Sequence, residues 1–215
     1  MLKRILGRSE EEKKIREQGR LPPGQSLTQK FPVLHYGAVP TFDPLTWNLK
    51  AWGEIEEKVE WSWDEFQALP RIKLKLDIHC VTRWSKVDTE WEGVSLASLI
   101  NSGMITPKPS AKFILQHCEN GFTVNLPLEV ALGENFLLAT HFDGEPLTAE
   151  HGHPLRGVIG AIPGRDDLMA PYFWKGGKWL RGLEFMVEDR RGFWEQAGYH
   201  NEADIWKEQR MVYSW

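Results

Sequence analysis

The chain lacks a disulfide framework, which is typical of small secreted proteins, and a long hydrophobic run, which a membrane span needs. Its 215 residues include only two cysteines, Cys80 and Cys118, so we expect free thiols in a reducing cytoplasm. Residues 1–24 are highly charged and contain no apolar run of the length that a secretory signal or a membrane span needs. No later segment contains one either. The sequence therefore predicts a cytoplasmic protein with no membrane span.

Several common signatures of ligand binding are also missing. The formal net charge of -4 provides no basic field for nucleic acid. There is no glycine-rich dinucleotide fingerprint and no Walker loop, which argues against a classical nucleotide site. No cysteines or histidines have the spacing of a zinc site. Tryptophan, in contrast, occurs 11 times, which indicates a large core and many pocket-lining rings.

Short strands and a few short helices are expected along the chain. Alternating or continuous apolar residues predict strands over 47–51, 72–80, 112–118, 122–126, 136–142 and 179–187. Ser62 and Glu65 have the spacing of a capping box and predict a helix over 63–69. Ser95 is placed to cap a second short helix, which ends before Gly103.

These elements indicate the class of fold. Because the strands do not alternate regularly with helices, we expect a mixed α+β fold dominated by sheet. The charged, helix-permissive start of the chain predicts an exposed N-terminal arm over 1–30. The rest, 31–215, contains no evident linker and is predicted to form one domain.

One predicted strand delivers a thiol to a loop. In the stretch RIKLKLDIHCVTRWS, residues 71–85, apolar and polar residues alternate from Ile72 onward, and Cys80 continues the apolar face. A rigid strand that ends in a loop is a common way to place a reactive group. The alternative is that Cys80 is a small packed hydrophobic residue, as lone cysteines on apolar strands usually are.

Two further roles for this cysteine stay open from the residues alone. His-Cys occurs at 79–80 and again at 117–118, but neighbours on a strand point to opposite faces and are poorly placed to share one zinc ion. A nucleophilic Cys80, with His151 or His153 as its base, would lack the local motifs of cysteine hydrolases. Either histidine is also compatible with a hydrogen-bonded turn.

Cations and aromatic residues gather in the C-terminal half of the chain. In GEPLTAEHGHPLR, residues 144–156, His151 and Arg156 lie among glycines and prolines. The later segment WKGGKWLRG adds three more cations, Lys175, Lys178 and Arg181. Fixed donors on a closely approaching backbone suit a phosphate-like anion held against an aromatic wall. The alternative is a solvated basic edge.

Six segments, taken in order, carry a resemblance to a known family. They are HYGAVPTFDP (35–44), DIHCVTRWS (77–85), HCENGFTVNLPL (117–128), DGEPLTAEHGHPLR (143–156), WKGGKWLRGLEF (174–185) and GFWEQAGYHNEADIWKEQR (192–210). Over most of its length the chain resembles the molybdopterin-binding domain of the sulfite oxidase family, and most closely its small cytoplasmic members. The resemblance implies the sulfite oxidase-type fold and a cofactor of molybdopterin and molybdenum.

The resemblance also implies roles for individual residues. Cys80 matches the cysteine that binds molybdenum, and a cationic surround would lower its pKa and favour the ligating thiolate. His151 and Arg156 match positions that contact the pterin. Lys175 and Lys178 match lysines that hold the pterin and its phosphate.

Five further residues match the family less closely or serve the substrate. His35 and Tyr36 match an early cofactor-contacting loop, and Cys118 matches a small polar position beside the pterin. Tyr199 matches a tyrosine on the substrate side, where it would donate a hydrogen bond or relay a proton. Arg83, next to Cys80, would attract an oxyanion such as sulfite or serve the pterin.

Some features depart from the family. Thr82 stands where the periplasmic methionine-sulfoxide-reducing relatives carry a carboxylate. The loop 157–174 looks longer than in close relatives. The chain has no cytochrome b5 module and no dimerisation domain of the animal enzymes, so the resemblance implies no particular electron partner or oligomeric state.

The resemblance implies an oxidoreductase that transfers an oxygen atom to or from a small sulfur- or nitrogen-centred substrate, sulfite or an S- or N-oxide. Its partners would be that small molecule and an unidentified electron donor or acceptor. The alternative is a non-catalytic module that keeps the fold and binds pterin or a partner protein.

Overall fold

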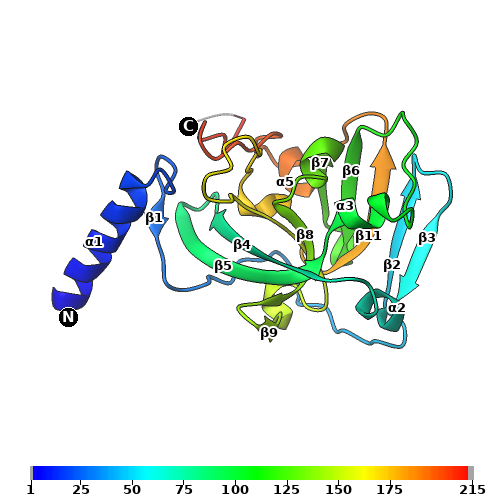
Figure 1. Ribbon diagram of the computed structural model, residues 1–215, viewed down its shortest axis with the longest axis horizontal. Coiled ribbons are helices and arrows are strands. Elements are labelled where there is room, and N and C mark those ends of the chain that lie inside the picture. The colour runs from blue at the N-terminus through cyan, green and yellow to red at the C-terminus, as the bar shows by residue number, and fades with distance from the viewer. Residues whose placement is uncertain (1, 213–215) are drawn as a thin grey trace.

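The structure of the protein is a computed structural model, which describes the backbone of residues 2–212 and the side chains of residues 10–212. Two β-sheets form its body (Figure 1). The first has the order β1-β5-β8-β10, with β4 paired to β5 and β9 to β8, and its strands are β1 (Ser26–Leu27), β4 (Ile72–His79), β5 (Trp84–Val94), β8 (Phe136–Phe142), β9 (Glu145–Pro146) and β10 (Arg156–Ile159). The second has the order β3-β2-β11-β6-β7, and its strands are β2 (Asn48–Gly53), β3 (Val59–Ser62), β6 (Phe113–Cys118), β7 (Thr123–Pro127) and β11 (Leu180–Met186).

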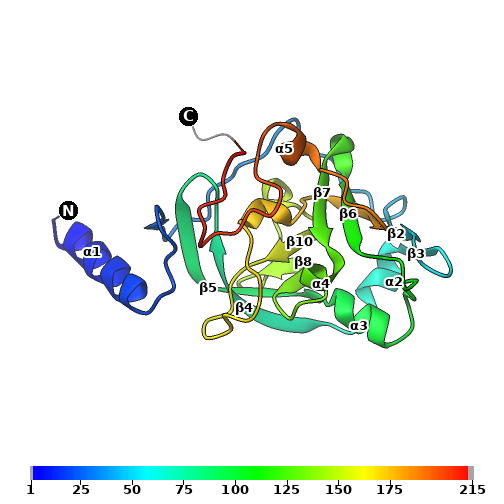
Figure 2. The same cartoon turned by 90° about the horizontal axis from the view of Figure 1, so that it is seen from above.

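Most of the helices are short and lie at the edges of the sheets. They are α1 (Leu2–Glu17), α2 (Trp63–Gln67), α3 (Leu96–Asn101), α4 (Leu128–Ala131), α5 (Phe193–Gln196) and the 3-10 helices η1 (Glu119–Gly121), η2 (Ala149–His151) and η3 (Phe173–Lys175). The longest, α1, extends away from the sheets in both views (Figures 1 and 2). None of the helices within residues 2–212 has both the length and the apolar character that a bilayer span requires.

The main hydrophobic core lies between the two sheets. Leu49 and Leu183 from the second sheet share it with Leu138 and Ile159 from the first, and all four side chains are fully buried. Packing of two apolar sheet faces against each other removes a large hydrophobic area from water and stabilises the fold. The predicted α+β fold dominated by sheet is confirmed.

The predicted helix caps are present. The Ser62 hydroxyl accepts a hydrogen bond from the Glu65 backbone N–H, and the Glu65 carboxylate accepts one from the Ser62 N–H at 2.8 Å. Ser95 caps α3 in the expected way. The predicted end of the first helix at residue 69 was wrong by two residues. Helix α2 ends at Gln67 because the chain tightens into a three-residue turn, in which the Leu69 N–H bonds to the Phe66 carbonyl.

Strand β4 differs from a simple half-buried strand. Leu76 and Ile78 are fully buried, as their alternation predicts, but the polar Asp77 and His79 are buried as well. Asp77 receives two hydrogen bonds from the Arg20 guanidinium, at 2.7 and 2.8 Å. At Asp77 the polar face is therefore covered by the N-terminal segment, which the alternation alone does not indicate.

Part of the N-terminal segment packs onto the first sheet. Strand β1 pairs in parallel with the start of β5, and Leu21, Gln25 and Leu27 are buried. The division of the chain into an arm over 1–30 and a domain over 31–215 remains a prediction. The burial of these three side chains shows that residues 20–28 belong to the packed structure.

Candidate functional site

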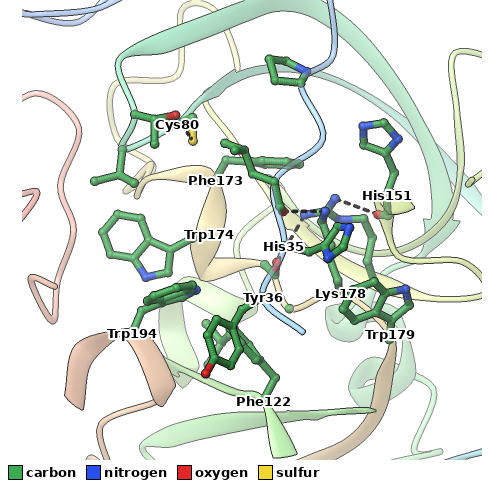
Figure 3. A pocket seen from close by; sticks show the side chains of 18 of the residues that line it. His35, Tyr36, Cys80, Phe122, His151, Phe173, Trp174, Lys178, Trp179 and Trp194 are labelled. Carbon is green, nitrogen blue, oxygen red and sulfur yellow. Dashed lines mark hydrogen bonds between the residues drawn. The ribbon is translucent and has the colours of Figure 1, made fainter. Parts of the chain in front are cut away.

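A cavity of about 270 Å³ opens where the β4–β5 turn, the loop 31–36 and the segment 173–179 meet. Of the ten site residues predicted from the sequence, seven line it: His35, Tyr36, Cys80, His151, Arg156, Lys178 and Tyr199. Segments that are far apart in the sequence therefore meet at one place (Figure 3).

Cys80 presents its thiol to this cavity from the end of β4. The residue is 8% exposed, and the Thr82 hydroxyl donates a hydrogen bond to its Sγ at 3.1 Å. Burial raises the pKa of the thiol, while the hydrogen bond from Thr82 and the charge of Arg210 offset part of the rise. The expected lowering of this pKa by a cationic surround was wrong, because desolvation outweighs the nearby charges.

The loop after Cys80 turns sharply back into β5. The Arg83 backbone has a φ of 71°, and its N–H donates to the Cys80 carbonyl at 3.0 Å. The Arg83 side chain does not line the cavity. It lies instead toward Gly24, where a Cβ would come 3.3 Å from a guanidinium nitrogen of Arg83.

Arg156 is a buried cation beside the cavity. Its guanidinium donates to the carbonyls of His151, Gly157 and Gly176 at 2.9, 3.2 and 3.3 Å, and lies 4.2 Å from the centre of the Phe173 ring. Burial lowers the pKa of Arg156 to about 9. All three of these acceptors are neutral carbonyls, so an anion in the cavity would find a positive charge that these hydrogen bonds leave uncompensated.

Lys178 approaches the cavity from a neighbouring position. Its Nζ donates to the carbonyls of Leu34 and Glu150 at 2.8 and 2.6 Å. Burial, together with repulsion from Arg156, lowers the pKa of Lys178 to about 7. Two cations close enough to repel each other, next to a cavity, favour a ligand with negative charge.

His151 contributes an unpaired polar atom. Its Nδ1 lies 2.9 Å from the Thr148 hydroxyl, and its ring stacks on Phe31 at 3.9 Å. Its Nε2 is buried and makes no hydrogen bond of normal geometry with the protein. Burial lowers the pKa of His151, and the charges of Lys178 and Arg156 lower it further. A buried nitrogen without a partner beside a cavity is available to bond a polar atom of a ligand.

The loop 31–36 brings the other two predicted cofactor contacts to the cavity. The His35 Nδ1 lies 3.1 Å from the Gly37 carbonyl, and its ring meets the edge of Trp179. Tyr36 is largely exposed and rests on Phe193. Both side chains border the opening of the cavity, so either would contact a ligand that filled it.

The residues fit an anionic cofactor that carries a thiolate-binding metal. Among the described residues that line the cavity, none is aspartate or glutamate. A thiol lies on one side, and a buried unpaired imidazole nitrogen and two cations lie on the other. Gly177 also lines the cavity, and its backbone packs closely against Cys118. A Cβ on Gly177 would come within 2.5 Å of the Cys118 Sγ. Within the described part of the chain no cluster of three or more His, Cys, Asp or Glu could hold a zinc ion.

Two residues expected at the cofactor lie elsewhere. The Nζ of Lys175 is fully buried and donates to Glu195 at 2.6 Å and to Asn125 at 3.0 Å. Burial lowers the pKa of Lys175, although the Glu195 carboxylate partly offsets the effect. Cys118 is also buried, and desolvation raises its pKa to about 12. Neither side chain lines the cavity, so their predicted contacts with a cofactor are not what the geometry favours.

An aromatic wall, which we define as Trp174, Trp194 and Tyr199, closes the side of the cavity near Cys80. Tyr199 contacts both tryptophans, with ring centres 5.3 and 5.1 Å apart. Figure 3 shows Cys80, Trp174 and Trp194 on one side of the cavity and His35, His151 and Lys178 on the other. Tyr199 was among the predicted site residues but the two tryptophans were not, although Trp174 and Trp194 lie in two of the segments that carry the family resemblance.

Known proteins are similar to this chain over most of its length. The sequence family described as "Oxidoreductase molybdopterin binding domain" matches residues 36–194. The uncharacterized oxidoreductase YuiH of Bacillus subtilis is 44% identical over 198 residues, which cover 92% of this chain and 94% of that protein.

More distant relatives are longer than this chain. A putative protein-methionine-sulfoxide reductase subunit, YedZ1 of Azospira oryzae, is 25% identical over 83% of this chain and 64% of its own length. The sulfite oxidase of Arabidopsis thaliana is 24% identical over 83% of this chain and 53% of its own length. The crystal structure of the sulfane dehydrogenase SoxCD from Paracoccus pantotrophus shares the fold, with a TM-score of 0.62 and 18% identity over 77% of this chain and 44% of that one.

Proposed function

Since the chain belongs to the oxidoreductase molybdopterin binding domain family, within the sulfite oxidase group that the sequence predicted, we propose that it transfers an oxygen atom to or from a small sulfur- or nitrogen-centred substrate. It is an oxidoreductase whose cofactor is molybdopterin with molybdenum. The observation that carries the proposal is the position of Cys80, whose thiol borders a cavity with cations and no carboxylate among its described lining residues.

The two sides of the cavity would bind different parts of the cofactor. Cys80 would bind the molybdenum, because a thiolate is a soft ligand. Arg156, Lys178 and the unpaired Nε2 of His151 would hold the anionic and polar groups of the pterin, with His35 at the opening. When bound, the cofactor supplies two-electron redox chemistry that the side chains cannot perform.

The protein side chains near Cys80 prepare the site for that chemistry. The hydrogen bond from Thr82 favours the charged form of the thiol, against the effect of burial. The aromatic wall lines the cavity on the side of the thiol and would shape the substrate space. Within it, Tyr199 carries a hydroxyl that would donate a hydrogen bond to the substrate or move a proton.

The surroundings of Cys80 favour a neutral substrate over sulfite. Val81 and Trp174 line the cavity and pack against one hydrophobic cluster, and the Arg83 side chain does not line the cavity. An uncharged S-oxide or N-oxide would lose less solvation on this apolar surface than an oxyanion would. A relative named as a putative protein-methionine-sulfoxide reductase subunit supports an S-oxide, although Thr82 departs from the carboxylate of the methionine-sulfoxide-reducing relatives. Sulfite is the second candidate, because other relatives are sulfite oxidases.

A non-catalytic module on the same fold is less well supported. Such a module would be favoured by a blocked cofactor face, whereas here Cys80, His151 and Lys178 border one open cavity. The cytoplasmic location expected from the sequence is part of the proposal, and cell fractionation would test it.

The test begins with protein purified from a host that makes molybdenum cofactor. We expect about one molybdenum and one pterin per chain, measured by elemental mass spectrometry and by fluorescence of the oxidised pterin. A reduced viologen dye would then supply two electrons for reduction of dimethyl sulfoxide or trimethylamine N-oxide, and ferricyanide would accept two electrons from sulfite. We expect kcat/KM for one of the neutral oxides to exceed that for sulfite at least about tenfold. Zinc or no metal in well-folded protein would contradict the cofactor assignment, and a preference for sulfite would contradict the substrate choice.

A further inference from the structure

The loop that carries Cys80 is held in place by both ends of the chain. The Cys80 carbonyl accepts a hydrogen bond from the Gln25 side-chain amide at 3.0 Å. The carbonyls of Arg83 and Ser85 accept from the backbone N–H groups of Ser26 and Thr28, at 3.0 and 2.8 Å. These donors come from the N-terminal segment, outside the residues 36–194 that match the family.

Gln25 connects the beginning of the loop with its end. Its side chain is 2% exposed, and while its amide nitrogen bonds to Cys80, its Oε1 accepts from the Ser85 hydroxyl at 3.4 Å. The Ser85 hydroxyl also lies 2.8 Å from the Nδ1 of the buried His79. A buried amide with both of its ends bonded is costly to disturb, so this connection is rigid.

Arg210 holds the same loop from the C-terminal side. Its guanidinium donates to the Val81 carbonyl at 3.0 Å and to the Pro23 carbonyl at 3.3 Å, and lies over the ring of the buried Tyr172. One side chain thus links the loop, the N-terminal segment and the interior. Together with the bonds from residues 25–28, it fixes the backbone on both sides of Thr82.

Few hydrogen bonds within the loop itself stabilise its conformation. Two backbone hydrogen bonds within it join the Cys80 N–H to the Trp84 carbonyl at 2.9 Å and the Arg83 N–H to the Cys80 carbonyl at 3.0 Å, and the Thr82 hydroxyl donates to the Cys80 Sγ at 3.1 Å. The positive φ of Arg83 adds conformational cost for a residue with a side chain. A turn of this kind would sample other conformations without its outside contacts.

We propose that Gln25 is a positioning residue which, with Arg210, fixes the Cys80 loop and thereby the direction of the thiol toward the cavity. The inference rests on the proposed role of Cys80 as a metal ligand. Residues that orient a ligand control its bond to the metal even though they do not touch the metal. The N-terminal segment is thus part of the site and not an appendage to it.

The test compares two glutamines in the same segment. Gln25→Met removes the hydrogen bonds of the buried amide with little change in volume, and Gln29→Met makes the same change at an exposed side chain that bonds to Glu11. Both variants and the wild type would be purified as holoenzymes. Hydrogen exchange of residues 80–85 by mass spectrometry reports the loop, and that of residues 113–127 in β6 and β7 reports the rest of the fold.

We expect Gln25→Met to speed amide exchange in 80–85 at least about tenfold while residues 113–127 keep the wild-type rates. The electron paramagnetic resonance spectrum of the molybdenum should shift or broaden, and kcat should fall more than KM changes. Gln29→Met should leave all these measurements unchanged. Wild-type exchange in 80–85 of Gln25→Met would overturn the inference.

Two further measurements keep the result interpretable. If Gln25→Met does not fold, Arg210→Met tests the same loop through Val81, and unchanged exchange there would equally overturn the inference. Cys80→Ser tests the role of Cys80 as a metal ligand separately from the contacts that hold its loop. A Cys80→Ser protein with the wild-type metal spectrum would refute the role of Cys80 as ligand, whereas the exchange data would still decide whether the two ends of the chain hold the loop.

Discussion

The dipeptide His-Cys ends a strand in each sheet, and the two copies have different surroundings. Cys80 follows β4 and Cys118 ends β6, and both residues are 8% exposed. Cys80 borders the cavity, whereas Cys118 belongs to the main hydrophobic core and does not line it. Equal burial therefore does not imply an equal role. The deciding feature is the backbone that lies in front of each thiol.

In front of Cys118 the space is taken by a close backbone approach. A Cβ on Gly177 would come within 2.5 Å of the Cys118 Sγ, and the Gly177 N–H is bonded to Gln116 of β6 at 2.9 Å. In front of Cys80 the chain instead turns away at Arg83, with a positive φ, and leaves the thiol beside the cavity. A thiol becomes a candidate ligand where the following loop opens and a packing residue where another segment closes over it.

The largest expected effect distinguishes the two cysteines directly. Cys80→Ser should lower kcat at least about 100-fold and alter the molybdenum spectrum, because a hydroxyl is a poor substitute for a soft thiolate ligand. Cys118→Ser should keep kcat within about threefold and cost about 1–2 kcal/mol of unfolding free energy, because a hydroxyl is buried in an apolar site. Steady-state kinetics and denaturant unfolding measure both. Similar losses of activity in the two variants would remove the distinction between the sites.

A second, smaller effect tests the contact that closes over Cys118. Gly177→Ala should cost about 1–3 kcal/mol through overpacking against Cys118, and it should lower the molybdenum content because Gly177 lines the cavity. The double variant Gly177→Ala with Cys118→Ala removes the sulfur and should recover much of both losses. Cys118→Ala alone serves as the control. Independent, additive effects of the two substitutions would show that the contact does not shape the cavity.

The smallest effect concerns the lowered pKa of Lys178, which lines the cavity. In cofactor-free protein the pKa of Lys178 is lowered from 10.5 to about 7, so between these values the unfolded chain binds one more proton than the folded chain. Unfolding free energy therefore rises with pH across this window, by at most about 1.4 kcal/mol per pH unit, and the effect is constant below it. Lys178→Met should remove this slope, and Lys112→Met, at an exposed lysine, should not. Denaturant unfolding at pH 7 to 9.5 measures it, and an unchanged slope in Lys178→Met would contradict the assignment.

Local patterns in the sequence predicted much of the fold. Strand β4, the capping box at Ser62 and Glu65, and the cap at Ser95 depend on neighbours within a few residues, and all are present. The burial of Asp77 could not be predicted in this way. It depends on Arg20, which lies 57 residues earlier in the chain and covers the polar face of the strand.

The residues of the candidate site were predicted less accurately than the fold, because some of them line the cavity and others do not. The structure brings Cys80, His151 and Lys178 to one cavity, as the resemblance to the family implied, and their roles as ligands stay predictions. Lys175 is only three residues from Lys178, but it points inward because Glu195 offers it a fully buried partner at 2.6 Å. Neither spacing nor composition distinguishes the two lysines.

The sequence by itself determined the class of fold, the strand that ends at Cys80 and, through its ordered motifs, the family. These depend on side-chain period and short-range hydrogen bonds, which are written into neighbouring residues. Only the tertiary structure decided which thiol faces the cavity and which lysine pairs with a buried carboxylate. It also decided that Gln25 and Arg210 contact the Cys80 loop. Those outcomes depend on contacts between segments up to 187 residues apart, as between Arg210 and Pro23, and no local pattern records where such segments meet.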